Sequence, residues 1–183
     1  KKYTVLLLTS FVFFTLTSNV RTEEPQTTPN TIESILEQPL REVIVSHTDS
    51  TGVLQLYCKK EDGSDSRQLT YSKHGCRMPA CSSDGKKLVY VQHHGHSLSL
   101  LVSNLNGNNS HNLHSDGRNL LPSWLPDSKH IVWMKTKPGQ DPSHNSQIHL
   151  MNTETGESRR LFTEPEQIKF SNSMPVVSPE GDR

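Results

Sequence analysis

The chain has 183 residues, of which 31% are hydrophobic, and its 19 basic residues are balanced by 19 acidic ones. This length allows one domain with a short leader, and the low hydrophobic content argues against a single large core. Because the formal net charge is zero, no long-range field attracts nucleic acid or an anionic membrane, which argues against a nucleic-acid-binding protein. The 11 prolines and 10 glycines favour short strands joined by tight turns over a helical bundle.

Residues 1–22 have the organisation of a secretory signal peptide. Two lysines precede an apolar stretch from Val5 to Leu16, and small residues at Val20 and Thr22 suit cleavage after Thr22. The stretch is short for a membrane span, which needs about 20 residues, and an uncleaved anchor is the alternative. We therefore expect an exported protein, periplasmic or extracellular, that meets the membrane only through this signal. The polar, proline-containing residues 23–40 predict a linker.

Three tandem copies of one pattern follow, at 41–85, 86–128 and 129–183. Each copy has short apolar or alternating runs rich in β-branched and aromatic residues, which favour half-buried strands. Asp62-Gly63 and Asn106-Gly107 separate such runs and predict hairpin turns. Four antiparallel strands repeated in this way are typical of the blades of a β-propeller.

Prolines and aspartate turns recur at fixed places in the copies. We expect each proline to begin the fourth strand of its copy, where a missing amide costs no ladder hydrogen bond. Cys81 stands where the second copy has Trp124, so we expect a buried thiol between sheets. The structural repeat positions are Pro79, Asp84, Gly85, Pro122, Trp124, Asp127 and Pro175.

The stretches PACSSDGKKLVYV at 79–91, PSWLPDSKHIVWM at 122–134 and PVVSPEGD at 175–182 resemble the repeat of TolB-like β-propellers. That repeat reads roughly Pro-x-Trp-Ser-Pro-Asp-Gly followed by Ile-x-Phe, and the resemblance covers about residues 41–183. This chain departs from it at Cys81, Ser128 and Val177, which replace Trp, Gly and Trp. The resemblance implies an all-β propeller of four-stranded antiparallel blades, of which about three are present.

Propellers typically have about 4 to 8 blades, so we interpret the chain as part of a longer propeller. A homodimer of half-propellers is the alternative, although a free blade edge carries an aggregation hazard.

His93, His94 and His96 are the candidate metal ligands, since imidazole is the commonest protein ligand of metals. They lie in a predicted hairpin turn with no carboxylate or Cys at ligand spacing. We therefore expect a surface turn, with a metal site as the alternative, and no cofactor. Cys58 and Cys76 lie in the same copy, and a disulfide between them is one alternative in an oxidising compartment.

No Gly-x-Ser-x-Gly elbow and no other catalytic motif is present, so no catalytic residue is assigned. The repeats predict an exported, non-catalytic scaffold that binds a protein, peptide or glycan partner across one propeller face. The alternative is the propeller portion of a prolyl oligopeptidase-type serine peptidase. The propeller of that class resembles these repeats, and its hydrolase domain is absent from this sequence.

Overall fold

The computed structural model describes residues 41–137, 139, 146–162, 175–178 and 180. The chain divides into two compact units, Lys1–Pro39 and Leu40–Arg183, and every described residue belongs to the second. The expected signal peptide and linker therefore lie outside the described residues. Within the described part, all regular elements are strands, and no helix there is long and apolar enough to cross a membrane.

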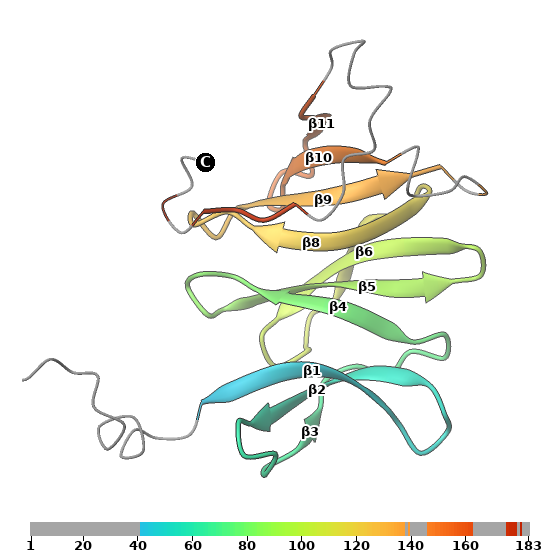
Figure 1. Cartoon of the computed structure of the whole chain (residues 1–183), viewed down its shortest axis with the longest axis vertical. Helices are drawn as coiled ribbons and strands as arrows, with labels where there is room; N and C mark the ends of the chain where they lie inside the picture. The colour runs from blue at the N-terminus through green and yellow to red at the C-terminus, as the bar shows by residue number, and fades with distance from the viewer. Residues whose placement is uncertain (1–40, 138, 140–145, 163–174, 179, 181–183) are drawn as a thin grey trace, which may run out of the picture. The chain divides into compact units, whose positions relative to one another are not determined.

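The described residues form eleven strands, which Figure 1 shows stacked in successive groups. Their bounds are β1 Glu42–Thr48, β2 Leu54–Lys60, β3 Arg67–Gln68, β4 Cys76–Cys81, β5 Lys87–His94, β6 Ser97–Asn104, β7 His111–His114, β8 Arg118–Trp124, β9 His130–Thr136, β10 Gln147–Asn152 and β11 Ser158–Arg160. The expected hairpin turns are confirmed, because Gly63 and Gly107 adopt φ of 85° and 86°, which only glycine reaches freely.

Antiparallel pairing groups the strands into three blades (Figure 1). The first blade is β1-β2-β3, the second is β4-β5-β6-β7, and the third is β8-β9-β10-β11. The second and third blades are joined by a single parallel residue pair, Leu98 of β6 with Arg118 of β8. A blade therefore begins with the strand that carries the proline, so the hydrogen-bonded blades are offset by one strand from the sequence repeats.

The proline strands begin earlier than the sequence predicts. Pro79 and Pro122 lie inside β4 and β8, and each follows a residue with positive φ, Met78 at 53° and Leu121 at 52°. Both strands shift register at this point, which marks a β-bulge. The expectation that proline starts its strand is therefore wrong. The bulge leaves an amide position outside the ladder, and proline fits there without losing a hydrogen bond.

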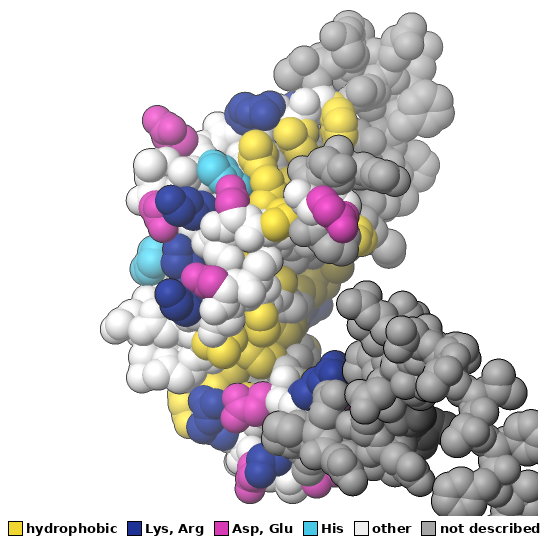
Figure 2. All heavy atoms as spheres, turned by 90° about the vertical axis from the view of Figure 1, so that its left-hand side faces the viewer, with side chains coloured by type: hydrophobic (Ala, Val, Ile, Leu, Met, Phe, Trp, Pro, Cys, Tyr) yellow, Lys and Arg dark blue, Asp and Glu magenta, His cyan; other side chains and the backbone are white. Residues whose placement is uncertain are grey.

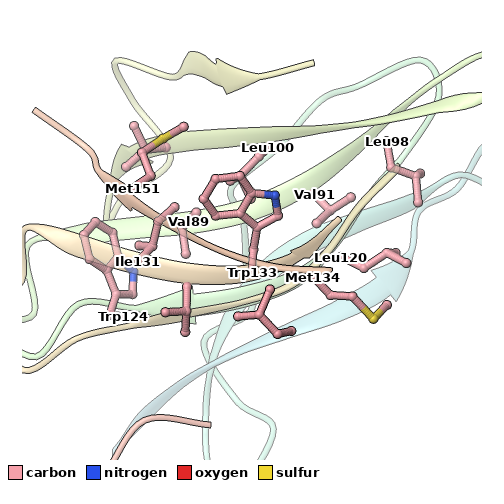
Figure 3. Packing of buried hydrophobic residues seen from close by; sticks show 13 residues of the cluster. Val89, Val91, Leu98, Leu100, Leu120, Trp124, Ile131, Trp133, Met134 and Met151 are labelled. Atoms are coloured by element: carbon pink, nitrogen blue, oxygen red, sulfur yellow. The ribbon is translucent and has the colours of Figure 1, made fainter. Parts of the chain in front are cut away.

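The main core lies between the second and third blades, and Figure 3 shows it from close by. Its largest fully buried side chain is Trp133, at 0% exposure, and burying a large apolar side chain stabilises by about 1.5–3 kcal/mol. The residues labelled in the figure are Val89, Val91, Leu98, Leu100, Leu120, Trp124, Ile131, Trp133, Met134 and Met151. A smaller cluster that includes Leu56 and Tyr90 joins the first and second blades.

Polar bonds also connect the second blade to the third. The Trp124 indole donates from Nε1 to the Ala80 carbonyl at 2.9 Å. Asn119 is fully buried; its Nδ2 donates to the Leu98 carbonyl at 2.7 Å, and its Oδ1 accepts from Trp133 Nε1 at 2.8 Å. Since buried polar groups are costly without partners, these bonds fix one arrangement of the two blades.

Two further expectations are wrong. Cys81 is exposed. Trp124 packs on β4, the first strand of the blade before its own. The described part of the first blade has only three strands, and none of them takes the corresponding position against Cys81. Pro175 does not begin a strand, since residues 175–178 have no strand assignment. Val177 nevertheless packs against the main core, so this segment still covers part of its apolar surface.

Candidate interaction site at the blade rim

The aspartates of the repeat build two equivalent turns on one rim of the blades. In the turn from β4 to β5, Asp84 Oδ1 accepts from Ser82 Oγ at 2.6 Å and from the Lys86 amide at 3.1 Å. In the turn from β8 to β9, Asp127 Oδ1 accepts from the amides of Lys129 and His130, both at 2.9 Å. The repeat positions Asp84 and Asp127 thus shape turns, as side-chain acceptors commonly do.

These bonds also set the charge state of the turns. The Ser82 hydroxyl, followed by the Lys86 amide, lowers the pKa of Asp84. Burial raises the pKa of Asp127, but the amides of His130 and Lys129 outweigh this and bring it below its ordinary value. Both carboxylates are therefore ionised at neutral pH.

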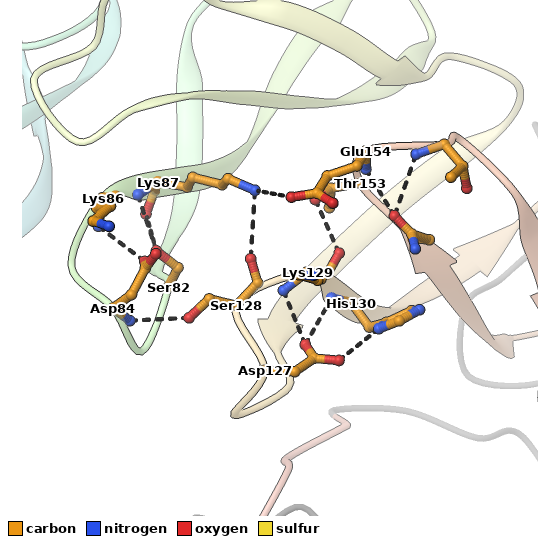
Figure 4. A network of polar contacts seen from close by, with 12 residues as sticks. Ser82, Asp84, Lys86, Lys87, Asp127, Ser128, Lys129, His130, Thr153 and Glu154 are labelled. Carbon is orange, nitrogen blue, oxygen red and sulfur yellow. Dashed lines mark hydrogen bonds and ion pairs between the residues drawn. The ribbon is translucent and has the colours of Figure 1, made fainter.

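Contacts between blades tie the turns into the network of Figure 4. The Asp84 amide donates to Ser128 Oγ at 2.9 Å, which links the two turns directly. Ser128 has φ of 55° at the place where the other turn has Gly85, so a serine in a left-handed conformation provides the linking hydroxyl. Lys87 Nζ donates to Glu154 Oε1 on the third blade at 3.2 Å and to the Ser128 carbonyl at 3.5 Å.

Beside this network lies an open hollow of about 330 Å³. It is lined by Lys87, Val102, Ser103, Asn104, Asn109, His111, Thr153 and Glu154. The end of β6, the loop that follows it and the start of β7 form one wall, and the turn between β10 and β11 forms the other. Thr153 is fixed because its amide and its hydroxyl both donate to the Lys129 carbonyl, each at 2.9 Å.

The hollow offers donors and acceptors of both charge signs. Figure 2 faces this rim and shows Lys and Arg side chains beside Asp and Glu side chains, next to a band of hydrophobic ones. Lys87 supplies an ammonium group, Glu154 a carboxylate, and Asn109 an amide on an exposed loop. Such a mixed lining suits the binding of a polar peptide segment better than that of a strongly charged polymer.

The sequence did not point to this hollow, because the ion pair across it joins residues 67 positions apart. The aspartate turns were the signal that could have located the rim. Nothing in the sequence indicated that Lys87 and Glu154 meet.

The histidines of the expected turn separate into two environments. His94 is exposed at the end of β5 and His96 is exposed in the turn, whereas His93 is half-buried with no hydrogen-bond partner for its buried Nε2 atom. Among the described residues, no group of three or more His, Cys, Asp or Glu side chains could hold a metal ion.

Cys58 and Cys76 are free thiols, both buried in the smaller core cluster. The structure therefore does not contain the disulfide that the sequence left open. Burial raises the pKa of both thiols and also keeps reagents from reaching them, which makes them unreactive.

The most strongly shifted histidine lies inside the blade interface. The ring of Trp133 packs against the rings of both His114 and His149, with centroid distances of 5.8 Å and 5.2 Å. Burial, together with the charges of Lys135, His114 and Arg160, lowers the pKa of His149 to about 4. Both imidazoles have a buried Nε2 atom without a hydrogen-bond partner, which marks this seam as sensitive to protonation.

No protein-family model matches the sequence, and no curated protein does. The fold matches solved β-propellers. A TolB from Agrobacterium tumefaciens matches with a TM-score of 0.57 at 20% identity, over 66% of this chain and 42% of that one. TolB from Acinetobacter baumannii gives 0.56 at 21% identity, over 71% of this chain and 33% of that one.

A puromycin-hydrolysing peptidase from Mycobacterium tuberculosis gives a TM-score of 0.55 at 16% identity, over 67% of this chain and 22% of that one. The described blades are thus those of a β-propeller. More closely, the fold is that of a TolB-like propeller, which confirms the resemblance. The chain spans less than half the length of each of these proteins, as expected of a partial propeller.

Proposed function

We propose that this chain is an exported, non-catalytic β-propeller segment that binds a protein or peptide partner at the blade rim. The observation that carries the proposal is the polar hollow between the second and third blades. Its walls are held by backbone and side-chain hydrogen bonds, so its groups are oriented before a partner arrives. Pre-organisation of this kind reduces the entropy cost of binding.

The partner is expected to contact Glu154, which is exposed on the hollow and holds Lys87. The test is affinity capture from the exported proteins of the source cell, using the full chain, a Glu154→Arg variant and a Glu157→Arg variant. Glu157 is a matched control, because it is exposed on the same turn and does not line the hollow. Quantitative mass spectrometry compares the captured proteins, and the purified partner is then titrated.

A partner bound by the wild type and by Glu157→Arg, but weakened tenfold or more by Glu154→Arg, supports the proposal. A partner that binds all three forms equally places recognition elsewhere on the protein. Hydrolysis of peptide substrates by the chain contradicts the non-catalytic role.

Export is tested separately by fusing residues 1–40 to a phosphatase that is active only outside the cytoplasm. Phosphatase activity with this leader, and its loss when Leu6, Leu7 and Leu8 are replaced by arginine, supports export. An inactive fusion that is nevertheless expressed contradicts it.

A second candidate is the propeller portion of a prolyl oligopeptidase-type serine peptidase. What favours it is the similarity of fold to the mycobacterial peptidase. Sequence beyond Arg183 in the source gene distinguishes the candidates: a Gly-x-Ser-x-Gly elbow followed by Asp and His supports the peptidase, and further repeats up to a stop codon contradict it.

A further inference from the structure

Two arginines and a histidine gather at the rim opposite the hollow, where β4 begins, β5 ends and β8 begins, on the right-hand side of Figure 1. They are Arg77, His93 and Arg118, and each is half-buried, so solvent reaches the cluster.

The strand register places the three on one side of the sheet. Arg77 is paired with Val91, and His93 is two residues further along β5, so the two side chains are diagonal neighbours on the same face. His93 pairs with Leu98, and Leu98 pairs with Arg118 across the blade boundary. The cluster thus exists only where the second and third blades meet.

Polar atoms at this end are left without partners inside the protein. Nε of Arg77 and Nε2 of His93 are both buried and have no hydrogen-bond partner. The same holds for Oγ1 of Thr136, a residue of β9 that pairs with Arg118 of β8. Buried polar groups are nearly always hydrogen-bonded, so these atoms leave hydrogen-bonding capacity here that the protein itself does not use.

The charges around the cluster favour an anion. Burial lowers the pKa of His93, and the charges of Arg77, Arg118 and His74 lower it further. Within the described part of the chain, neither arginine forms an ion pair, since the four ion pairs there use other residues. The two guanidinium groups therefore have no counter-charge among the described residues, and an added anion would supply one.

We propose that Arg77, His93 and Arg118 form a binding site for a carboxylate group of an acidic peptide segment. A guanidinium group binds a carboxylate through two parallel hydrogen bonds, and a protonated imidazole donates a further one. The cluster is too small for nucleic acid, whose binding needs cations along an extended surface, and the chain carries no net charge. The site is separate from the rim hollow and does not depend on the function proposed for it.

The probe is a capped tetraglutamate peptide, titrated into the full chain by calorimetry at low ionic strength, with capped tetraglutamine and inorganic phosphate as comparison ligands. Arg77→Gln and Arg118→Gln are the test variants. Arg159→Gln is the matched control, because Arg159 is an exposed arginine of β11 outside the cluster. Circular dichroism of each variant confirms that it is folded.

Tetraglutamate is expected to bind the wild type and Arg159→Gln equally, and at least fivefold more weakly to each test variant. The NMR titration of the His93 ring should shift to higher pH when the peptide is bound, because a nearby carboxylate stabilises imidazolium. Equal binding to all variants, an unchanged His93 titration, or equally tight binding of tetraglutamine would overturn the proposal. Tighter binding of phosphate than of tetraglutamate would overturn the assignment to carboxylate.

Discussion

Acidification should weaken the seam between the second and third blades through His149. The imidazole is neutral in the folded protein, with a pKa near 4, and its ordinary value is 6.5. Below pH 6.5 the unfolded chain therefore binds more protons at this position than the folded chain does. The contribution of His149 to the free energy of unfolding is therefore fully present above pH 6.5 and is lost as the pH falls toward 4.

The magnitude follows from the same values. One unit of pKa difference corresponds to about 1.4 kcal/mol, so a fully buried imidazole would contribute about 3 kcal/mol. His149 is half-buried, and solvent screening reduces its share to about 1–2 kcal/mol at pH 4.5. His114 should add to the loss, because burial lowers its pKa as well.

Urea unfolding of the wild type and of His149→Phe between pH 7.5 and pH 4.5 tests this reasoning. Phenylalanine keeps an aromatic ring against Trp133 and cannot be protonated. The variant should lose about 1–2 kcal/mol less stability over this range than the wild type does. His111→Phe, at an exposed histidine of β7, is the control and should follow the wild type. Parallel pH profiles for the wild type and His149→Phe would refute the argument.

Two substitutions and one labelling experiment provide further tests of the packing. Asn119→Ala removes two buried hydrogen bonds, including the one from the Trp133 indole, and should cost about 2–4 kcal/mol in urea unfolding. Gly117→Ala places a Cβ 2.6 Å from a backbone oxygen at a φ of 79°, and should lower Tm far more than Gly52→Ala, where φ is similar but the space is open. In the native protein a thiol reagent should modify Cys81 alone, and labelling of the two buried thiols at the same rate would contradict the packing.

The sequence determined the local structure of this protein. Alternation of apolar and polar residues has the period of a strand, and Asn-Gly and Asp-Gly pairs favour the positive φ of hairpin turns, so strands and turns could be placed from neighbours alone. The recurrence of proline and aspartate at fixed positions then predicted the propeller and its equivalent aspartate turns.

Only the tertiary structure decided what packs between blades. Trp124 is buried and its counterpart Cys81 is exposed, although their local patterns match, because burial depends on whether another blade's inner strand lies beneath the residue. The rim hollow and the cationic cluster likewise join residues that are distant in sequence, such as Lys87 with Glu154. Pattern and propensity describe a residue's own strand, and they carry no information on which strand of another blade will face it.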